Sequence, residues 1–193
     1  MTDPVVHLLA GPNGAGKTTL YDKVLGPATL LQFVNADLIA AQRWPGEEEQ
    51  RGRDASAAAA QLRNVLIAER RSFITETVFS HSSKVELVTR LLDAGYRVHL
   101  HAVIVPVQLA VARGANRADN GGHSVPEHKV RERDSRLWPL VADSIRLVQE
   151  ATVYDNSSAA RPHRVVAQFL AGRAFGDNAW PAWAPSELVA LTS

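Results

Sequence analysis

A glycine-rich loop between an apolar run and a helical pattern constrains this chain more than any other feature. Residues 11–18, GPNGAGKT, match the pattern G-x-x-x-x-G-K-[ST] at every position. The apolar run from Val5 to Ala10 precedes the loop and predicts a buried strand. A helix from Lys17 to Leu25, closed by Gly26-Pro27, is expected to follow. A strand, a glycine-rich turn and a helix in this order are typical of a phosphate-binding loop.

Each residue type in the loop has a chemical role. Glycines let the backbone approach phosphate oxygens, and successive N–H groups then form an anion-binding nest at a helix N-terminus. Lys17 is expected to reach the β- and γ-phosphates, and the Thr18 hydroxyl is the expected Mg²⁺ ligand. The predicted cofactors are therefore ATP and Mg²⁺. The predicted ATP-binding residues are Gly11, Pro12, Asn13, Gly14, Ala15, Gly16, Lys17, Thr18 and Thr19.

The rest of the chain alternates between strand and helix patterns. This alternation predicts an α/β fold of the P-loop NTPase type, with a parallel sheet and helices on both faces. Because the tail from residue 172 is rich in Trp, Pro and Gly and has no predicted structure, we expect a P-loop kinase domain at 1–171 and a tail of unknown role at 172–193. The further strands are expected at 33–35, 73–76, 96–105, 152–154 and 164–170, and the further helices at 55–70, 82–94, from Pro106, and from Pro126 with a kink at Pro139.

Composition excludes several other classes. With 193 residues the chain is long enough for one domain, and the absence of cysteine removes disulfide scaffolds, thiolate metal sites and cysteine nucleophiles. The net charge is +1 and no basic stripe with interleaved aromatics occurs, so no nucleic-acid partner is expected. No apolar run approaches the roughly 20 residues that span a bilayer. We therefore expect a cytoplasmic protein that does not bind membranes.

Polar residues follow the predicted strands, where ligands bind in parallel sheets. Asp37 comes two residues after Asn35, and its carboxylate would suit a base that orients or deprotonates an acceptor hydroxyl. Asp37 would equally suit the N-cap of the next helix. Glu76, followed by Thr77 and Ser80, could hold a magnesium-bound water or a substrate hydroxyl, or belong to an ordinary loop.

Five arginines surround a glycine-containing polar segment at 117–125. Arginine forks match the charge that spreads over a transferring phosphoryl group, and a loop that carries them could close over ATP. The alternative is a solvated helix face on which Arg131, Glu132, Arg133 and Asp134 pair among themselves. The five residues are Arg113, Arg117, Arg131, Arg133 and Arg136.

Four segments together resemble the zeta-toxin family of P-loop kinases, with matching order and spacing from Val5 to about Phe169. They are Asn35-Ala36-Asp37, residues 76–81 (ETVFSH), residues 121–126 (GGHSVP) and residues 154–157 (YDNS). The resemblance implies a fold like nucleotide and shikimate kinases and ATP-dependent phosphorylation of a sugar hydroxyl of UDP-N-acetylglucosamine. It implies that Asp37 is the catalytic base and that Glu76 contacts the sugar. The predicted acceptor-binding residues are Asn35, Asp37, Glu76, Thr77 and Ser80.

The resemblance also points to Arg117, then Arg113, as the arginines that act on the phosphoryl group. Known zeta toxins carry an arginine close to where His123 falls, so His123 is expected either to contact phosphate or to cap the next helix. Residues 154–157 would lie near the adenine or form a plain polar turn. Many family members are inhibited by an antitoxin, which here would be a separate chain.

Two other functions fit the same sequence. The first is a kinase of the same fold with another acceptor, such as a nucleotide, a dinucleotide or an antibiotic hydroxyl. The second is a nucleotide-dependent switch ATPase without an acceptor, which would hydrolyse ATP without a phosphorylated product and would not need Asp37. A transporter ATPase is excluded, because no strand ends in adjacent acidic residues and the serine-glycine-glycine signature is missing.

Overall fold

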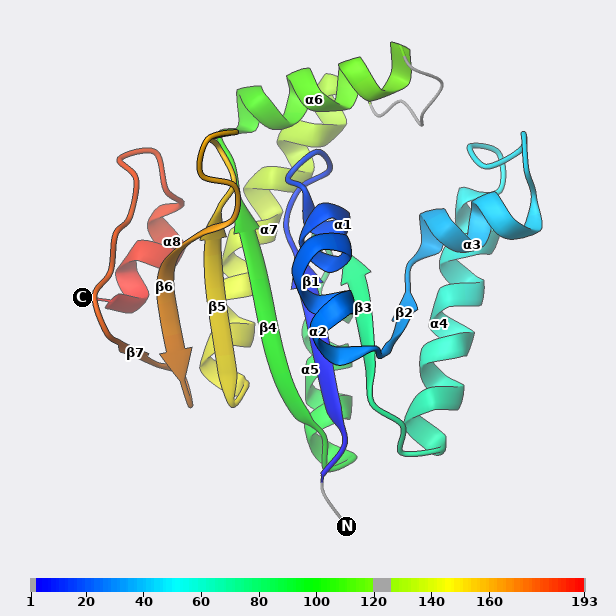
Figure 1. Cartoon of the computed structure of the whole chain (residues 1–193), viewed down its shortest axis with the longest axis horizontal. Coiled ribbons are helices and arrows are strands. Elements are labelled where there is room, and N and C mark those ends of the chain that lie inside the picture. The colour runs from blue at the N-terminus through cyan, green and yellow to red at the C-terminus, as the bar shows by residue number, and fades with distance from the viewer. Residues whose placement is uncertain (1–2, 120–125, 193) are drawn as a thin grey trace.

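The computed structural model of the protein describes residues 3–119 and 126–192, the side chains of 117–119 excepted. Its strands form one seven-stranded sheet in the order β2-β3-β1-β4-β5-β6-β7 (Figure 1). The predicted α/β architecture is confirmed, and the predicted strands are found within two residues of their expected ends. The strands are β1 (Val5–Ala10), β2 (Gln32–Val34), β3 (Phe73–Thr77), β4 (Arg97–Ile104), β5 (Glu150–Asp155), β6 (Arg164–Leu170) and β7 (Arg173–Phe175).

The strand that leads into the glycine-rich loop lies near the middle of the sheet. β1 pairs in parallel with β3 on one side and with β4 on the other. Ala10, the last residue of β1, is in register with Thr77 of β3 and with Ala102 of β4. The segments that follow β1 and β3 therefore leave the sheet at the same edge, which brings residues 11–18 close to Glu76.

The last two strands pair antiparallel: β6 runs against β5, and β7 runs against β6. Only eight residues, 156–163, separate β5 from β6. That is shorter than the dozen or so residues that a parallel crossover needs, so β6 returns antiparallel beside β5. β7 then pairs with β6 through the two-residue turn Ala171-Gly172, where both φ angles are positive (48° and 74°) as in a tight hairpin.

Helices cover both faces of the sheet, as the sequence predicts (Figure 1). One face packs against α4, α5, α7 and α8 in a core that contains Leu66, Leu91, Val141 and Leu188. The other packs against the helical segment after the loop and against α6, around Leu9 and Val103. The helices are α1 (Lys17–Leu20), α2 (Gly26–Thr29), α3 (Ala36–Arg43), α4 (Gly52–Ala68), α5 (Ser83–Asp93), α6 (Val107–Asp119), α7 (Glu127–Leu147) and α8 (Ser186–Val189).

The helical segment after the loop is longer than expected. The predicted end at Gly26-Pro27 is wrong, because a π-helical turn, Tyr21–Leu25, joins α1 to α2 and the segment continues to Thr29. Pro27 lies in the first turn of α2, where a missing N–H does no harm. The segment ends at Leu30, which adopts a left-handed conformation with φ of 55°.

The C-terminal segment packs onto the main core. The side chain of Leu188 in α8 is fully buried, and the Ala179 N–H donates to the Val166 carbonyl of β6 at 2.8 Å. Trp180 donates its indole N–H to Thr192 at 3.1 Å.

None of the helices within residues 3–119 and 126–192 has the length and apolar character of a membrane span. α7 continues through Pro139 as one helix.

Candidate active site

The glycine-rich loop has a tightly constrained backbone. Gly16 has a φ of 92° and Gly11 a φ of 149°, conformations that side-chain-bearing residues rarely adopt. A Cβ on Gly11 would lie 2.6 Å from the Val103 carbonyl oxygen, and one on Gly16 would collide with the Asn156 amide nitrogen. The loop therefore requires glycine at both positions, on conformational and on steric grounds.

Two side chains from the β5–β6 connection support this loop. The Asn156 amide donates to the Ala15 carbonyl at 2.8 Å, and the His163 Nε2 lies 3.0 Å from the Gly16 carbonyl oxygen. Asn156 also accepts from the backbone N–H of His163 at 3.3 Å. That residues 154–157 lie near the adenine stays a prediction. The contacts that Asn156 and His163 make are with the phosphate loop. The sequence offered no signal for His163.

Glu76 lies at the centre of the polar network beside the loop. The Thr18 hydroxyl donates to Glu76 Oε2 at 2.8 Å, and the Asn35 amide donates to the same oxygen at 2.9 Å. The buried Lys17 ammonium lies 3.4 Å from Glu76 Oε1 and donates to the Pro12 carbonyl at 3.0 Å. The structure thus brings Lys17, Thr18, Asn35 and Glu76 together, although they come from three separate stretches of sequence.

The same network fits a magnesium ion. Mg²⁺ prefers hard oxygen ligands and is usually held by one or two carboxylates together with water and substrate phosphates. The Thr18 hydroxyl and a Glu76 carboxylate oxygen, 2.8 Å apart, offer such a pair beside the phosphate loop. Thr18 and Glu76 would hold the ion, which would supply positive charge to neutralise the phosphates.

Asp37 lies in the first turn of α3, next to this network. The N-cap of α3 is Asn35, whose side-chain oxygen accepts from the N–H groups of Asp37 at 2.7 Å and Leu38 at 3.1 Å. The alternative interpretation of Asp37 as the N-cap is therefore wrong. Its carboxylate is exposed and makes no hydrogen bond to the other side chains that the structure describes, so it remains available to an acceptor.

Thr77 is the last residue of β3, and Ser80 lies in the segment that follows it. Phe79 lies between them, fully buried, with a φ of 68° that is rare for a bulky residue. The Thr77 hydroxyl accepts from the Phe79 N–H at 3.3 Å. Strained backbone of this kind clusters at functional sites, and here the buried ring anchors it. The local sequence does not mark Phe79 as an anchor, because a phenylalanine by itself predicts only burial.

Two half-buried cations lie behind β3. Arg63 of α4 donates to the Thr75 hydroxyl at 3.5 Å, and burial, together with nearby Arg90, lowers the pKa of its guanidinium. Burial and the charge of Arg63 lower the pKa of Lys84 in α5. Neither cation has a carboxylate partner in the parts of the chain that the structure describes. Among the described residues, these two cations therefore add positive charge without an ion-pair partner.

The predicted arginines divide into two groups. Arg113 of α6 lies over the phosphate loop, with its guanidinium 3.4 Å from the Gly14 carbonyl oxygen. Arg131 pairs with Glu127 at 2.8 Å and Arg136 pairs with Glu132 at 3.4 Å on the exposed surface of α7. These i,i+4 pairs fit a solvated helix face, but they are not the predicted pairs within residues 131–134. The Arg117 side chain and residues 120–125, including Gly121, Gly122 and His123, lie outside the described residues.

Asp155 and Arg164 form an ion pair across β5 and β6, next to Asn156. They are in register and lie 3.0 Å apart. Burial alone would raise the pKa of Asp155, but hydrogen bonds from Ser157 and the Arg164 guanidinium hold it below the ordinary value. The pair is therefore expected to stabilise the strand ends that position Asn156.

This pair makes stability depend on pH. Because the folded pKa of Asp155 is lowered, its contribution is fully present above the unfolded pKa of about 3.9 and is lost as pH falls through the folded pKa. Thermal unfolding of wild type and Asp155→Asn should show a lower Tm for the variant at pH 7 and a smaller difference below about pH 4. Asp143→Asn, in an exposed pair with Arg146, is the control. A difference independent of pH would contradict the assignment.

The phosphate loop and the sheet define a protein with a P-loop fold of the kinase-like type. The model of the AAA domain family matches residues 6–140, which include the phosphate loop, Asp37 and Glu76. The chain belongs to this family. A relative in Haemophilus influenzae, described only as an uncharacterized protein, is 29% identical over 124 residues, which cover 64% of this chain and 87% of the relative.

Solved structures share the fold at low sequence identity. The AvrRxo1-ORF1:AvrRxo1-ORF2 complex with sulphate ions matches with a TM-score of 0.73 and 15% identity, over 92% of this chain and 62% of that chain. This chain thus spans less than two thirds of that protein. The PezAT toxin-antitoxin system of Streptococcus pneumoniae matches with a TM-score of 0.63 and 16% identity, over 86% and 72%. Shikimate kinase from Acinetobacter baumannii matches at 0.55 and 23%, over 83% and 88%.

Proposed function

We propose that the protein is an ATP- and Mg²⁺-dependent kinase of the zeta-toxin type that phosphorylates a sugar hydroxyl of UDP-N-acetylglucosamine. The observation that carries the proposal is the convergence of Lys17, Thr18 and Glu76 in one hydrogen-bonded network, with the exposed Asp37 beside it. A phosphate loop alone serves many ATPases, whereas an available carboxylate next to it suits transfer to a hydroxyl.

In the proposed reaction the acceptor hydroxyl oxygen attacks the γ-phosphorus of ATP. The bond between that phosphorus and the β–γ bridging oxygen breaks, ADP leaves, and the hydroxyl proton passes to the Asp37 carboxylate. Lys17 neutralises charge on the β- and γ-phosphates. Arg113 and Arg117 are the proposed donors to the equatorial oxygens of the transferring group.

The unpaired cations support an acceptor that carries negative charge. Arg63 contacts Thr75 of β3 and interacts electrostatically with Lys84, and an acceptor with phosphate groups would supply the missing compensation. A sugar nucleotide meets this requirement through its diphosphate. Phosphorylated acceptors of other kinds would meet it too, so the acceptor itself must be identified by its reaction product.

Glu76 is predicted to act on the magnesium ion rather than on the sugar. Glu76→Gln removes the charge beside Thr18 and should raise the Mg²⁺ concentration for half-maximal rate by about 10-fold or more. Initial rates at saturating ATP over a Mg²⁺ series would measure this, with Glu86→Gln on the exposed face of α5 as control. If instead the Mg²⁺ dependence stays unchanged and the acceptor KM rises, Glu76 contacts the acceptor as the family resemblance implies.

We also propose that an inhibitory partner is a separate chain that covers the phosphate-loop edge of the sheet. Support comes from two structures of the same fold. One is the complex of AvrRxo1-ORF1 with AvrRxo1-ORF2, and the other belongs to the PezAT toxin-antitoxin system. Such an inhibitor would compete with ATP. Non-competitive inhibition would contradict this placement.

A further inference from the structure

Three histidines gather on the open face of the sheet, away from the phosphate-loop edge. His7 projects from β1, and His99 and His101 project from β4 on the same face, because they are two residues apart and His7 is in register with His99. In Figure 1 the helical segment after the phosphate loop lies in front of β1, while the lower parts of β4 and β5 have no helix in front of them. We propose that this trio binds a divalent transition-metal ion, with Zn²⁺ as the best fit.

The distances suit a metal centre. One ring nitrogen from each histidine lies within 4.8 Å of the others, and His7 Nδ1 is 2.9 Å from His101 Nε2. In a tetrahedral site with Zn–N bonds of 2.0–2.1 Å, ligand atoms are about 3.3 Å apart. Bringing the three nitrogens to that spacing requires movements of about 1 Å or less in each ring, within reach of small side-chain rotations.

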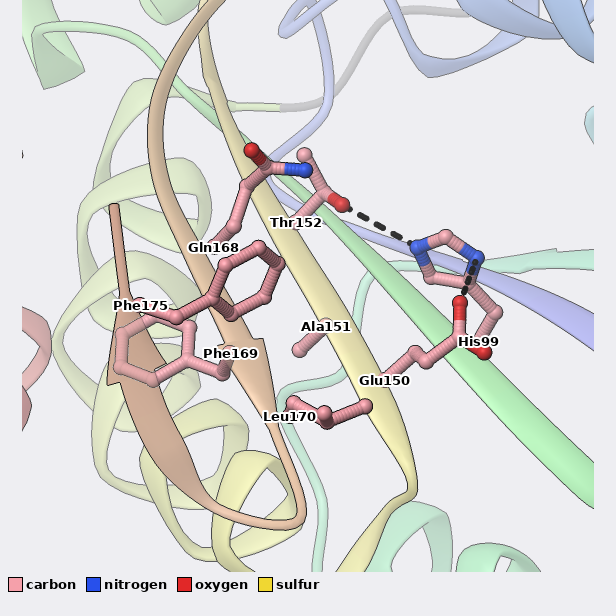
Figure 2. Close-up of a pocket in the computed structure, with 8 residues that line it drawn as sticks. All are labelled: His99, Glu150, Ala151, Thr152, Gln168, Phe169, Leu170 and Phe175. Carbon is pink, nitrogen blue, oxygen red and sulfur yellow. Dashed lines mark hydrogen bonds and ion pairs between the residues drawn. The ribbon is translucent and has the colours of Figure 1, made fainter. Parts of the chain in front are cut away.

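The remaining ring nitrogens of His99 and His101 already have oxygen partners. His101 Nδ1 lies 3.1 Å from the Tyr154 hydroxyl. His99 lies between Thr152 and Glu150 of β5, with Nε2 3.1 Å from the hydroxyl and Nδ1 3.4 Å from the carboxylate (Figure 2). Metal-binding histidines almost always donate their second N–H to such an oxygen, which fixes the ring and its tautomer. Whichever nitrogen of His99 faces the ion, the other keeps a partner.

The ligand type sets the choice of metal. Three imidazoles select Zn²⁺, Co²⁺, Ni²⁺ or Cu²⁺ over Mg²⁺, which separates this site chemically from the oxygen ligands at Thr18 and Glu76.

Space for a fourth ligand lies beside the trio. A cavity of about 210 Å³, bordered by His7, His99 and Glu150, has room for water molecules. A water or the Glu150 carboxylate would complete the coordination. A bound ion would link β1, which leads directly into the phosphate loop, to its neighbour β4. This proposal does not depend on the kinase activity.

Metal binding to the purified full chain tests the proposal. Protein stripped with a chelator and dialysed would be titrated with ZnCl₂ by calorimetry, and with CoCl₂ while visible absorption is recorded. We expect one Zn²⁺ per chain, a Co²⁺ spectrum of four- or five-coordinate nitrogen-rich geometry, and a higher Tm with Zn²⁺. His7→Gln and His99→Gln, both at half-buried positions, should each weaken Zn²⁺ binding by about 10- to 100-fold.

His128→Gln is the matched control, since His128 is exposed on α7 and lies outside the trio. The Tm of each variant without metal shows whether it folds. Because His101 is buried and its replacement risks misfolding, the two half-buried positions carry the test. Equal Zn²⁺ affinity in His99→Gln and His128→Gln, or no binding by wild type, would show that the trio is a hydrogen-bonded histidine cluster only.

Discussion

Replacing Lys17 with alanine should lower kcat/KM for ATP by about 1000-fold. The Lys17 ammonium is the one described cation held inside the phosphate loop, 3.0 Å from the Pro12 carbonyl oxygen and 3.4 Å from Glu76. Removing a single preorganised group that stabilises developing charge typically costs about 10²- to 10³-fold in rate, and Lys17 also contributes to phosphate binding. Coupled detection of ADP over an ATP series measures the loss.

Lys23→Ala is the control for this experiment. Lys23 lies in the π-helical turn, exposed and outside the loop, and its removal should leave the rate within about twofold of wild type. The Tm of Lys17→Ala should confirm that the variant is folded. Wild-type turnover by a folded Lys17→Ala variant would exclude residues 11–18 as the site of phosphate transfer.

Replacing Asp37 with asparagine should lower kcat by about 10²- to 10⁴-fold and leave ATP affinity unchanged. The substitution keeps size and polarity but removes the proton acceptor. Because Asn35, not Asp37, caps α3, the helix start should persist in the variant. Steady-state kinetics with the acceptor, together with calorimetric titration of ATP, separates the loss of chemistry from a loss of binding.

Asp54→Asn is the matched control, because Asp54 is also an exposed aspartate in the first turn of a helix, α4. It should keep wild-type kcat. Unchanged transfer in Asp37→Asn would remove Asp37 as the base. If both variants hydrolysed ATP at the wild-type rate without forming a phosphorylated product, a nucleotide-dependent switch would explain the chain better than a kinase.

Local patterns in the sequence were sufficient to predict most of the fold. The run from Val5 to Ala10, the glycine-rich loop and the alternation of strands with helices predicted a P-loop sheet, and the structure and the family match confirm it. The convergence of residues 11–18 with Glu76 follows from a general property, since carboxyl ends of parallel strands meet at one edge. That property also brought Asn35 to the same place.

The missed features depend on contacts between distant segments. His163 supports Gly16 from 147 residues away, and no local pattern encodes this contact. Gly26-Pro27 usually ends a helix, but the π-helical turn before it allowed the helix to continue. The antiparallel direction of β6 depends on the length of its connection rather than on its own residues. The histidine trio combines β1 and β4, so only the strand register reveals it.

A mass-spectrometric transfer assay tests the proposed kinase activity directly. Purified protein would be incubated with ATP, Mg²⁺ and UDP-N-acetylglucosamine, alongside Lys17→Ala and Asp37→Asn. Wild-type protein should add one phosphate to the sugar nucleotide, and both variants should fail to do so. A wild-type protein that binds ATP and Mg²⁺ but leaves UDP-N-acetylglucosamine unmodified would contradict the proposed acceptor.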